Sequence, residues 1–190
     1  MYYITNPTSK KYFREKKRNT LTGFSIGLKI ILNRPLKYGL VSKKNVYGEY
    51  LMSAKPRSSS EKKFEKFCES CSAVDWIYKN GDKGDEYFTI VYLDNANRQK
   101  LFYPDYIVSV KGEVWIIETK GGFDKTGASE DIDIFSPKKF DVLKADLTKY
   151  GLKGGFVRYD KQSEELCICT DNYNNDINSD DWKILSEIFK

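Results

Sequence analysis

The chain has 190 residues, of which 40% are hydrophobic and 31% charged, a balance typical of a folded soluble domain with an extension. It carries a net charge of +5 and contains no histidine, which excludes Ser-His-Asp hydrolases, Cys-His proteases and enzymes that hold zinc through histidine. No apolar run approaches the roughly 18 residues of a spanning helix and the N-terminus lacks a signal-peptide pattern, so we expect a cytoplasmic protein without a membrane segment.

The positive charge is concentrated in the first third of the chain. Residues 1–63 contain 15 lysines and arginines and three acids, a balance of +12, which leaves −7 for the rest of the chain. We divide the chain near Arg57 into a basic N-terminal extension with short strands, residues 1–57, and a core, residues 58–190. Such an extension favours a polyanion as partner, although a solvated basic surface would have the same composition.

In chain order, the extension has a basic stretch with aromatic residues at 10–19 and strand-like segments at 23–35 and 45–52. A helix is predicted from Ser58, because Phe64, Phe67, Cys68 and Cys71 follow helical spacing. Strands are predicted at 74–80, 86–93, 100–110 and 113–120. A helix from Ser136 to the residue before Gly151, strands at 154–160 and 165–170, and a terminal helix at 179–190 follow. This order predicts an α/β sandwich with a mixed central sheet.

Glu61 lies on the flank of the apolar face of the first helix, where it would look toward the core or its edge. The same residue also completes the pattern Ser58-x-x-Glu61. In such a capping box the carboxylate bonds back to the start of the helix. The sequence leaves both roles open for Glu61.

The hairpin at 103–122 carries charges on positions that otherwise point inward. If Lys111-Gly112 is a two-residue turn, paired residues have numbers that sum to 223, and Asp105 then stands opposite Glu118. Opposed side chains share one face of the sheet, with Cβ atoms roughly 4.5–5.5 Å apart. Lys120 points to the same face. A longer turn than Lys111-Gly112, or a bulge at Pro104, would shift this register.

Apolar residues on both faces of the strand that contains Glu118 indicate a central strand covered on both sides. Two neighbouring buried carboxylates are costly unless a cation lies between them. Oxygen ligands without histidine suit Mg²⁺ or Mn²⁺, which would polarise a phosphodiester and activate a bound water beside the lysine. The alternative is a structural ion pair at the end of two strands.

Four cysteines form two close pairs, Cys68 with Cys71 and Cys167 with Cys169. The first pair matches half of a zinc site. Both pairs nevertheless continue apolar patterns, which favours buried thiols over a structural zinc protein.

The residues Pro104-Asp105, then 12 intervening residues, then Glu118-Thr119-Lys120 resemble the PD-(D/E)xK nuclease superfamily. The ordered blocks SSSEKKFEKF, VDWIYKN, YFTIVY, YPDYIV and VWIIETKGG are similar to the C-terminal endonuclease domain of type III restriction subunits and helicase-linked relatives. The resemblance covers about residues 58–158. It implies a three-layer restriction-endonuclease-like sandwich, with helices flanking the mixed sheet, and an Mg²⁺-dependent deoxyribonuclease.

The resemblance also implies roles for individual residues. Asp105 and Glu118 would bind Mg²⁺ or Mn²⁺, the main-chain carbonyl of Thr119 would complete the ligation, and Lys120 would be the catalytic lysine. Glu61 matches the helix glutamate that supports the metal or its waters. Lys144 is a loose match for a residue that approaches the phosphate, and Lys79 and Asn80 fit the strand pattern without an assigned role.

The chain departs from type III subunits in one respect, because it has no G-x-x-x-x-G-K-[ST] phosphate loop and therefore no motor. The expected partner is DNA, and the protein would act alone, as a homodimer or beside a separate helicase or modification subunit, in a restriction or mobile-element system. The alternative function is a catalytically silent nuclease-fold module that binds nucleic acid or assembles with a motor subunit.

Overall fold

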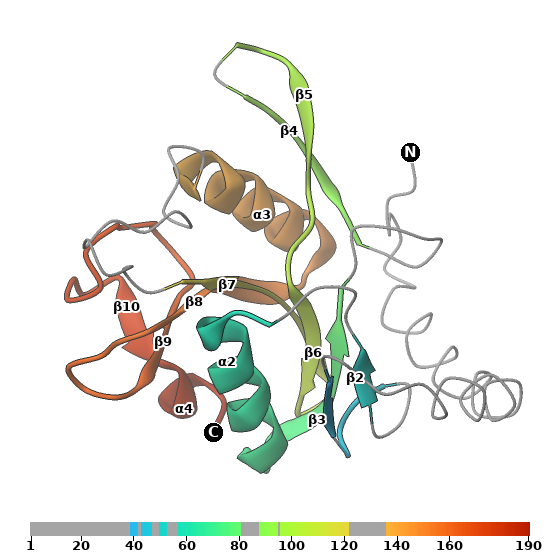
Figure 1. The fold of residues 1–190 in the computed structure, drawn as a ribbon. Helices are drawn as coiled ribbons and strands as arrows, with labels where there is room; N and C mark the ends of the chain where they lie inside the picture. The colour runs from blue at the N-terminus through green and yellow to red at the C-terminus, as the bar shows by residue number, and fades with distance from the viewer. Residues whose placement is uncertain are drawn as a thin grey trace, which may run out of the picture.

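The structure is a computed structural model that describes residues 39–41, 43–46, 50–52, 57–80, 88–94, 96–121 and 136–190. The basic stretch at 10–19 and the strand-like segment at 23–35 lie outside the described residues. The elements of the described part, shown in Figure 1, are β1 (Gly39–Val41), β2 (Tyr50–Met52), α2 (Ser59–Ser70), β3 (Val74–Lys79), β4 (Ile90–Leu93), β5 (Gln99–Phe102), β6 (Tyr106–Val110), β7 (Glu113–Lys120), α3 (Ser136–Tyr150), β8 (Lys153–Tyr159), β9 (Leu166–Cys169), β10 (Trp182–Ile184) and α4 (Leu185–Ile188).

A six-stranded sheet in the order β10-β9-β8-β7-β6-β3 forms the centre of the protein. β7 and β8 run parallel, and the other neighbouring pairs in this sheet run antiparallel. α3 is the crossover between the two parallel strands, since parallel neighbours need a long connection. The predicted α/β class with a mixed central sheet is therefore confirmed.

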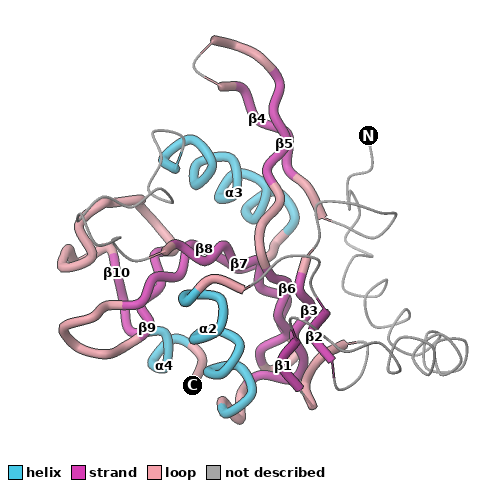
Figure 2. The backbone as a smooth tube through the Cα atoms, viewed as in Figure 1, coloured by secondary structure: helices cyan, strands magenta, loops and turns pink. Residues whose placement is uncertain are grey.

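Helices lie on both faces of this sheet, with α3 on one side and α2 and α4 on the other (Figures 1 and 2). Alternate residues of β7 belong to two different hydrophobic clusters, one on each face of the sheet. Val114 and Ile116 pack with residues of α3, whereas Trp115 and Ile117 pack with residues of α2 and α4. Alternate side chains of a strand point to opposite faces, so the pattern confirms β7 as a central strand covered on both sides.

The hairpin between β6 and β7 has the predicted register. Tyr106 pairs with Ile117 and Val110 with Glu113, and both pairs sum to 223. Lys111 and Gly112 have φ angles of 49° and 79°, the two positive values that a type I′ turn requires. The ladder ends at Tyr106, one residue short of Asp105, which lies in a bend.

The predicted strand at 100–110 is wrong as a single element. It divides into β5 and β6 around Pro104, which has no N–H with which to continue a ladder. β4 and β5 form a separate two-stranded hairpin, with Ile90 opposite Phe102, that projects past α3 in Figure 1. The expected meander is thus interrupted by an arm outside the main sheet, and the strand predicted from 86 begins at Ile90.

The predicted terminal helix at 179–190 is also largely wrong. Trp182–Ile184 forms the edge strand β10, which pairs with β9, and the helix that follows is the short α4. Leu185 and Phe189, from this last segment, are buried in the cluster under α2. Strand pairing and this burial outweigh the helical pattern of the sequence. In the N-terminal part, the segment predicted at 45–52 contains β2 and an isolated bridge from Asn45 to Ile77.

None of the helices in the described part of the chain is long and apolar enough to cross a membrane.

Candidate active site

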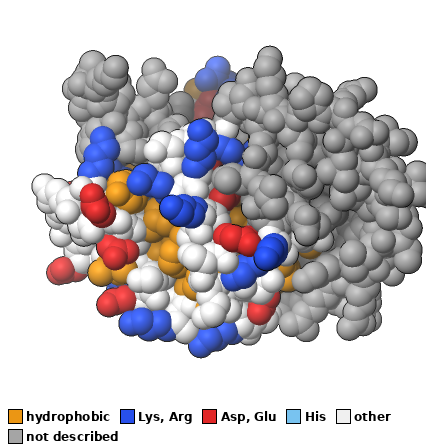
Figure 3. Space-filling model, turned by 60° about the horizontal axis from the view of Figure 1, so that its bottom comes forward, with side chains coloured by type: hydrophobic (Ala, Val, Ile, Leu, Met, Phe, Trp, Pro, Cys, Tyr) orange, Lys and Arg blue, Asp and Glu red, His pale blue; other side chains and the backbone are white. Residues whose placement is uncertain are grey.

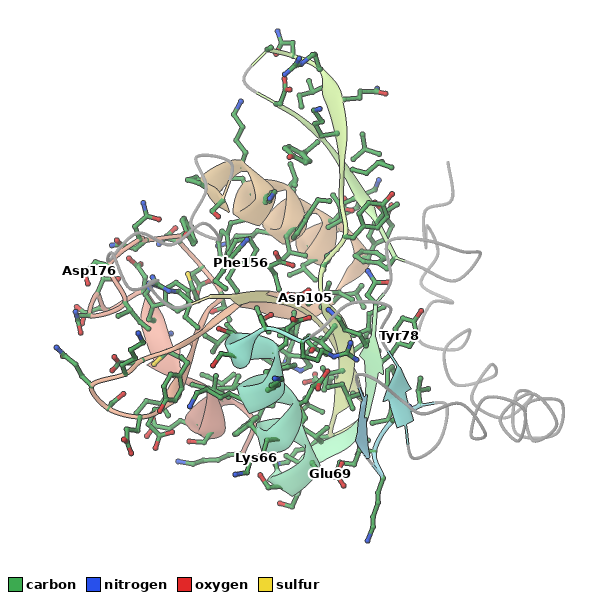
Figure 4. The ribbon with its side chains drawn as sticks, in the orientation of Figure 1. Lys66, Glu69, Tyr78, Asp105, Phe156 and Asp176 are labelled. Atoms are coloured by element: carbon green, nitrogen blue, oxygen red, sulfur yellow. The ribbon has the colours of Figure 1, made fainter. Side chains whose placement is uncertain are left out.

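The candidate site lies where β7 ends and β6 begins, beside the start of α2. In Figure 4, Asp105 lies between the N-terminal end of α2 and the central sheet. α2 begins here because Ser58 caps it: the Ser58 hydroxyl accepts a hydrogen bond of 3.1 Å from the main-chain N–H of Glu61. The hairpin turn and the capped helix together bring residues from distant parts of the sequence to one end of the sheet.

Asp105 is held by both of its carboxylate oxygens. Oδ2 accepts hydrogen bonds from the main-chain N–H of Thr119 at 2.9 Å and from the Thr119 hydroxyl at 2.6 Å. Oδ1 lies 2.8 Å from the ammonium group of Lys79. The sequence predicts that Asp105 pairs directly opposite Glu118. In the structure Asp105 lies just outside the paired residues, and its carboxylate binds Thr119 and Lys79.

Glu118 and Lys120 form the second part of the site. Lys120 Nζ lies 3.1 Å from Oε1 of Glu118 and 4.7 Å from the centroid of the Phe156 ring, and its side chain is 4% exposed. Oε2 of Glu118 is buried and has no hydrogen-bond partner. Glu118 and Lys120, on the same face of β7, thus form an ion pair in which Oε2 of Glu118 has no partner.

Burial raises the pKa of Glu118 to about 8, and the negative charge of Asp105 adds to this rise. The positive charges of Lys120 and Lys139 oppose it. The two carboxylates are thus close enough for the charge of Asp105 to raise the pKa of Glu118. Lys139, in the first turn of α3, is a nearby cation that no pattern in the sequence singled out.

Glu61 has both of the roles that the sequence left open. Its Oε2 accepts a hydrogen bond of 2.7 Å from the main-chain N–H of Ser58, which completes the capping box. Its Oε1 lies 2.7 Å from Lys79 Nζ. Burial alone would raise the pKa of Glu61, but its interactions with Lys79 and its hydrogen bonds with Ser58 together outweigh burial and lower it.

Lys79 is the residue of the site whose role the sequence did not reveal. It ends β3 and joins Glu61 to Asp105. Burial would lower its pKa, but the two carboxylates outweigh burial and raise it, so that Lys79 is a cation. One feature of the sequence could have indicated this role. Lys79 ends a strand whose other residues are mostly apolar, and a charge in such a position needs a partner.

Asn80, the next residue, fixes the segment that carries Asp105. Its side-chain amide donates to the main-chain carbonyls of Phe88 at 2.7 Å and Pro104 at 2.8 Å, and its oxygen accepts from the N–H of Phe88 at 2.8 Å. Its own N–H donates to the carbonyl of Asp105 at 2.8 Å. Asn80 therefore joins the two ends of the β4–β5 arm to the start of β6.

Lys144 does not contact these carboxylates. Its ammonium group donates to the main-chain carbonyl of Asp171 at 2.5 Å and lies 3.5 Å from Oδ1 of the same residue. The structure thus places this loosely matched lysine at the loop after β9.

The donor set fits a hard divalent cation in its chemistry. Asp105 and Glu118 supply carboxylate oxygens, the Thr119 carbonyl would add a third, and the buried, unpartnered Oε2 of Glu118 is an oxygen that a cation would satisfy. Within the described residues, three or more Asp, Glu or Cys side chains do not gather into a ready-made metal cage. The two carboxylates would therefore leave several positions on the ion to water and substrate.

The cysteines do not form one cluster. Cys68 is buried in the cluster under α2, whereas Cys167 and Cys169 are buried in the cluster under α3, on the other face of the sheet. Cys71 is half-buried and packs beside Cys68. These positions are those of packed thiols, and the sheet separates the two pairs, so the four thiols do not form one zinc site.

Comparison of the chain with family models, curated proteins and solved structures finds no significant match.

Proposed function

We propose that this protein is a metal-dependent endonuclease that hydrolyses DNA phosphodiester bonds. The observation that supports it best is the group Asp105, Glu118 and Lys120 at the end of two central strands, with one buried carboxylate oxygen left without a partner. In this proposal the helices on both faces and the mixed sheet correspond to a restriction-endonuclease-like three-layer sandwich. The resemblance of the hairpin to the PD-(D/E)xK pattern supports the same assignment.

Each residue has a distinct task in this proposal. Asp105 and Glu118, with the Thr119 carbonyl, would hold Mg²⁺ or Mn²⁺, which when bound supplies an activated water and neutralises charge on the phosphate. Lys120 would orient the attacking water and stabilise the negative charge that develops on the phosphate oxygens. Hydrolysis adds the water oxygen to phosphorus and breaks the bond to one sugar oxygen, which takes up a proton as it leaves.

The positioning of these groups depends on residues around them. Thr119 fixes the Asp105 carboxylate through two hydrogen bonds. Phe156 packs against Lys120 and restricts the path of its ammonium group. Because such groups are held before substrate binds, little reorganisation would be required during the reaction.

Cleavage of supercoiled plasmid tests the proposal. With Mg²⁺ or Mn²⁺ we expect nicked and linear products from the full chain, and a loss of at least about 100-fold in rate for Asp105→Ala and Lys120→Ala. Asp141→Ala in α3 and Lys183→Ala in β10 remove exposed charges of the same kind and serve as controls. Equal cleavage by all four variants would show that the assigned site is wrong.

A second function is favoured by one observation, the ion pair between Lys79 and Asp105. If this lysine permanently satisfies Asp105, the protein would be a nuclease-fold module that binds nucleic acid or assembles with a separate motor subunit without cutting. Salt-sensitive DNA binding that Glu118→Ala leaves unchanged, with no cleavage under either metal, would support this alternative. A thermal shift caused by Mn²⁺ and abolished by Asp105→Ala would count against a purely scaffolding role, and cleavage that Asp105→Ala abolishes would exclude this alternative.

A further inference from the structure

Lys79 is a cation built into the candidate site. Its ammonium group lies 2.7 Å from Oε1 of Glu61, 2.8 Å from Oδ1 of Asp105 and 4.6 Å from the centroid of the Tyr106 ring. Its side chain is 14% exposed. A lysine with two carboxylates at hydrogen-bond distance and an aromatic ring beside it is fixed in place, unlike an exposed lysine with free rotamers.

The carboxylate oxygens around Lys79 are almost fully engaged. Both oxygens of Glu61 are bonded, one to the Ser58 N–H and one to Lys79. Both oxygens of Asp105 are bonded, one to Thr119 and one to Lys79. Oε1 of Glu118 is paired with Lys120, which leaves Oε2 of Glu118 as the open oxygen among the six. Oε2 of Glu118 is therefore the one of these six oxygens that a cation can bind without displacing a hydrogen bond or an ion pair.

The total charge of these side chains also limits the number of divalent ions that the site can hold. With the three carboxylates ionised, as a bound cation favours, they and the two lysines Lys79 and Lys120 sum to −1 before the nearby Lys139 is counted, so one divalent ion brings this group of five to +1. A second would bring it to +3 in a buried region, where like charges repel strongly. A second ion beside Glu61 and Asp105 would require the departure of the Lys79 ammonium group from both partners.

We propose that Lys79 limits the site to one divalent ion, and that Glu61 acts through Lys79 and not as a metal ligand. Lys79 is then a positioning residue: it holds Oδ1 of Asp105, and Oε2 of Glu118 is left for the ion. This inference rests on the proposed function, and it assigns to Glu61 a different role from the metal support implied by the sequence resemblance.

The number of Mn²⁺ ions bound per chain tests the proposal without any reaction. Titration of the full chain, followed by the electron paramagnetic resonance signal of free Mn²⁺, is expected to give one ion in the wild type. Lys79→Met has a similar length and no charge, so it frees one oxygen each of Glu61 and Asp105 and is expected to admit a second ion. Lys62→Met, an exposed neighbour of Glu61 in α2, is the control and should give one ion.

Glu61→Gln provides an independent measurement if Lys79→Met does not fold. The amide keeps one acceptor oxygen, which can serve Ser58 or Lys79 but not both, while Lys79 keeps its ion pair with Asp105. We therefore expect the affinity for the first ion to change by less than about threefold, whereas loss of a direct ligand would cost about tenfold or more. Two ions in the wild type, one ion in a folded Lys79→Met, or a tenfold loss in Glu61→Gln would each overturn the inference. No Mn²⁺ binding by the wild type would overturn the proposed function, and the inference with it.

Discussion

Glu118 carries an energetic penalty in the folded protein that the unfolded chain does not have. Its pKa is about 8 in the folded state against a usual value of 4.5, chiefly because burial disfavours the charged form and Asp105 repels it. Between these two values the folded state holds a proton that the unfolded state has released. The free energy of unfolding therefore falls as the pH rises through this window, by on the order of a few kcal/mol.

Glu118→Gln should remove this pH dependence. The neutral amide has nearly the same shape and no charge to bury, so the metal-free variant is expected to be more stable than the wild type near pH 8.5 and equally stable near pH 5. Thermal unfolding in the presence of a chelator, recorded from about pH 5 to pH 9, measures the difference. Mn²⁺ should flatten the wild-type curve, because a bound cation favours the ionised carboxylate.

Glu113→Gln is the matched control for this experiment. It lies on the same strand, β7, but is exposed and pairs with Lys153 at 2.7 Å. Surface ion pairs contribute about 0–1 kcal/mol, so this variant should keep the wild-type slope. If Glu118→Gln also kept that slope, another group would be responsible for it.

At the scale of elements, the β4–β5 arm is fixed to the site by one buried side chain. Asn80 is 6% exposed and makes three side-chain hydrogen bonds to the two ends of the arm, at Phe88 and Pro104. Replacement of its amide by a carboxylate removes both donors and places a negative charge next to two carbonyl oxygens.

Asn80→Asp should therefore destabilise the protein by about 2–4 kcal/mol, since each unsatisfied buried group costs about 1–3 kcal/mol. Urea unfolding followed by tryptophan fluorescence measures this destabilisation. Asn97→Asp, an exposed residue with a φ of 56° in the turn of the same arm, is the control and should be nearly neutral. Equal destabilisation by the two variants would show that the hydrogen bonds of Asn80 do not hold the arm.

The sequence was most informative where local patterns determine the structure. The turn at Lys111 and Gly112 predicted the register of β6 and β7, and alternating apolar residues identified both faces of β7. Ser136 at its start and Gly151 after its end gave the limits of α3. These features depend on neighbours along the chain, which a sequence displays directly.

The features that the sequence did not reveal depend on contacts between distant segments. The partners of Lys79 are 18 and 26 positions away, at Glu61 and Asp105, and no spacing rule connects them. β10 forms because β9 offers an edge to pair with, against a helical pattern in its own residues. The glycine pair Gly154-Gly155 is a sequence feature that indicates close packing between distant segments. A Cβ atom at either position would lie 2.1 Å from a carbonyl oxygen of a neighbouring strand.

At the scale of the whole molecule, the site exists only when the sheet has assembled. Its groups come from α2, the end of β3, the bend before β6 and the end of β7. Figure 3 shows one face of the molecule, on which lysine and arginine side chains are interspersed with acidic ones over the described surface. The described surface in this view is therefore of mixed charge, and the excess positive charge of the sequence lies in residues 1–63.

This distribution of charge predicts that the N-terminal extension determines the affinity for DNA. Metal binding is expected to be independent of the extension. Replacement of Lys16, Lys17 and Arg18 by glutamine in the full chain should weaken DNA binding and reduce the slope of log K against log salt, by up to about 0.9 for each phosphate that the extension no longer neutralises. Fluorescence anisotropy with a labelled duplex from about 50 to 200 mM salt measures the slope. The triple variant of the exposed Lys161, Lys183 and Lys190 removes the same charge and should leave the slope nearly unchanged. Equal effects of the two triple variants would mean that net charge, and not the extension, governs the encounter with DNA.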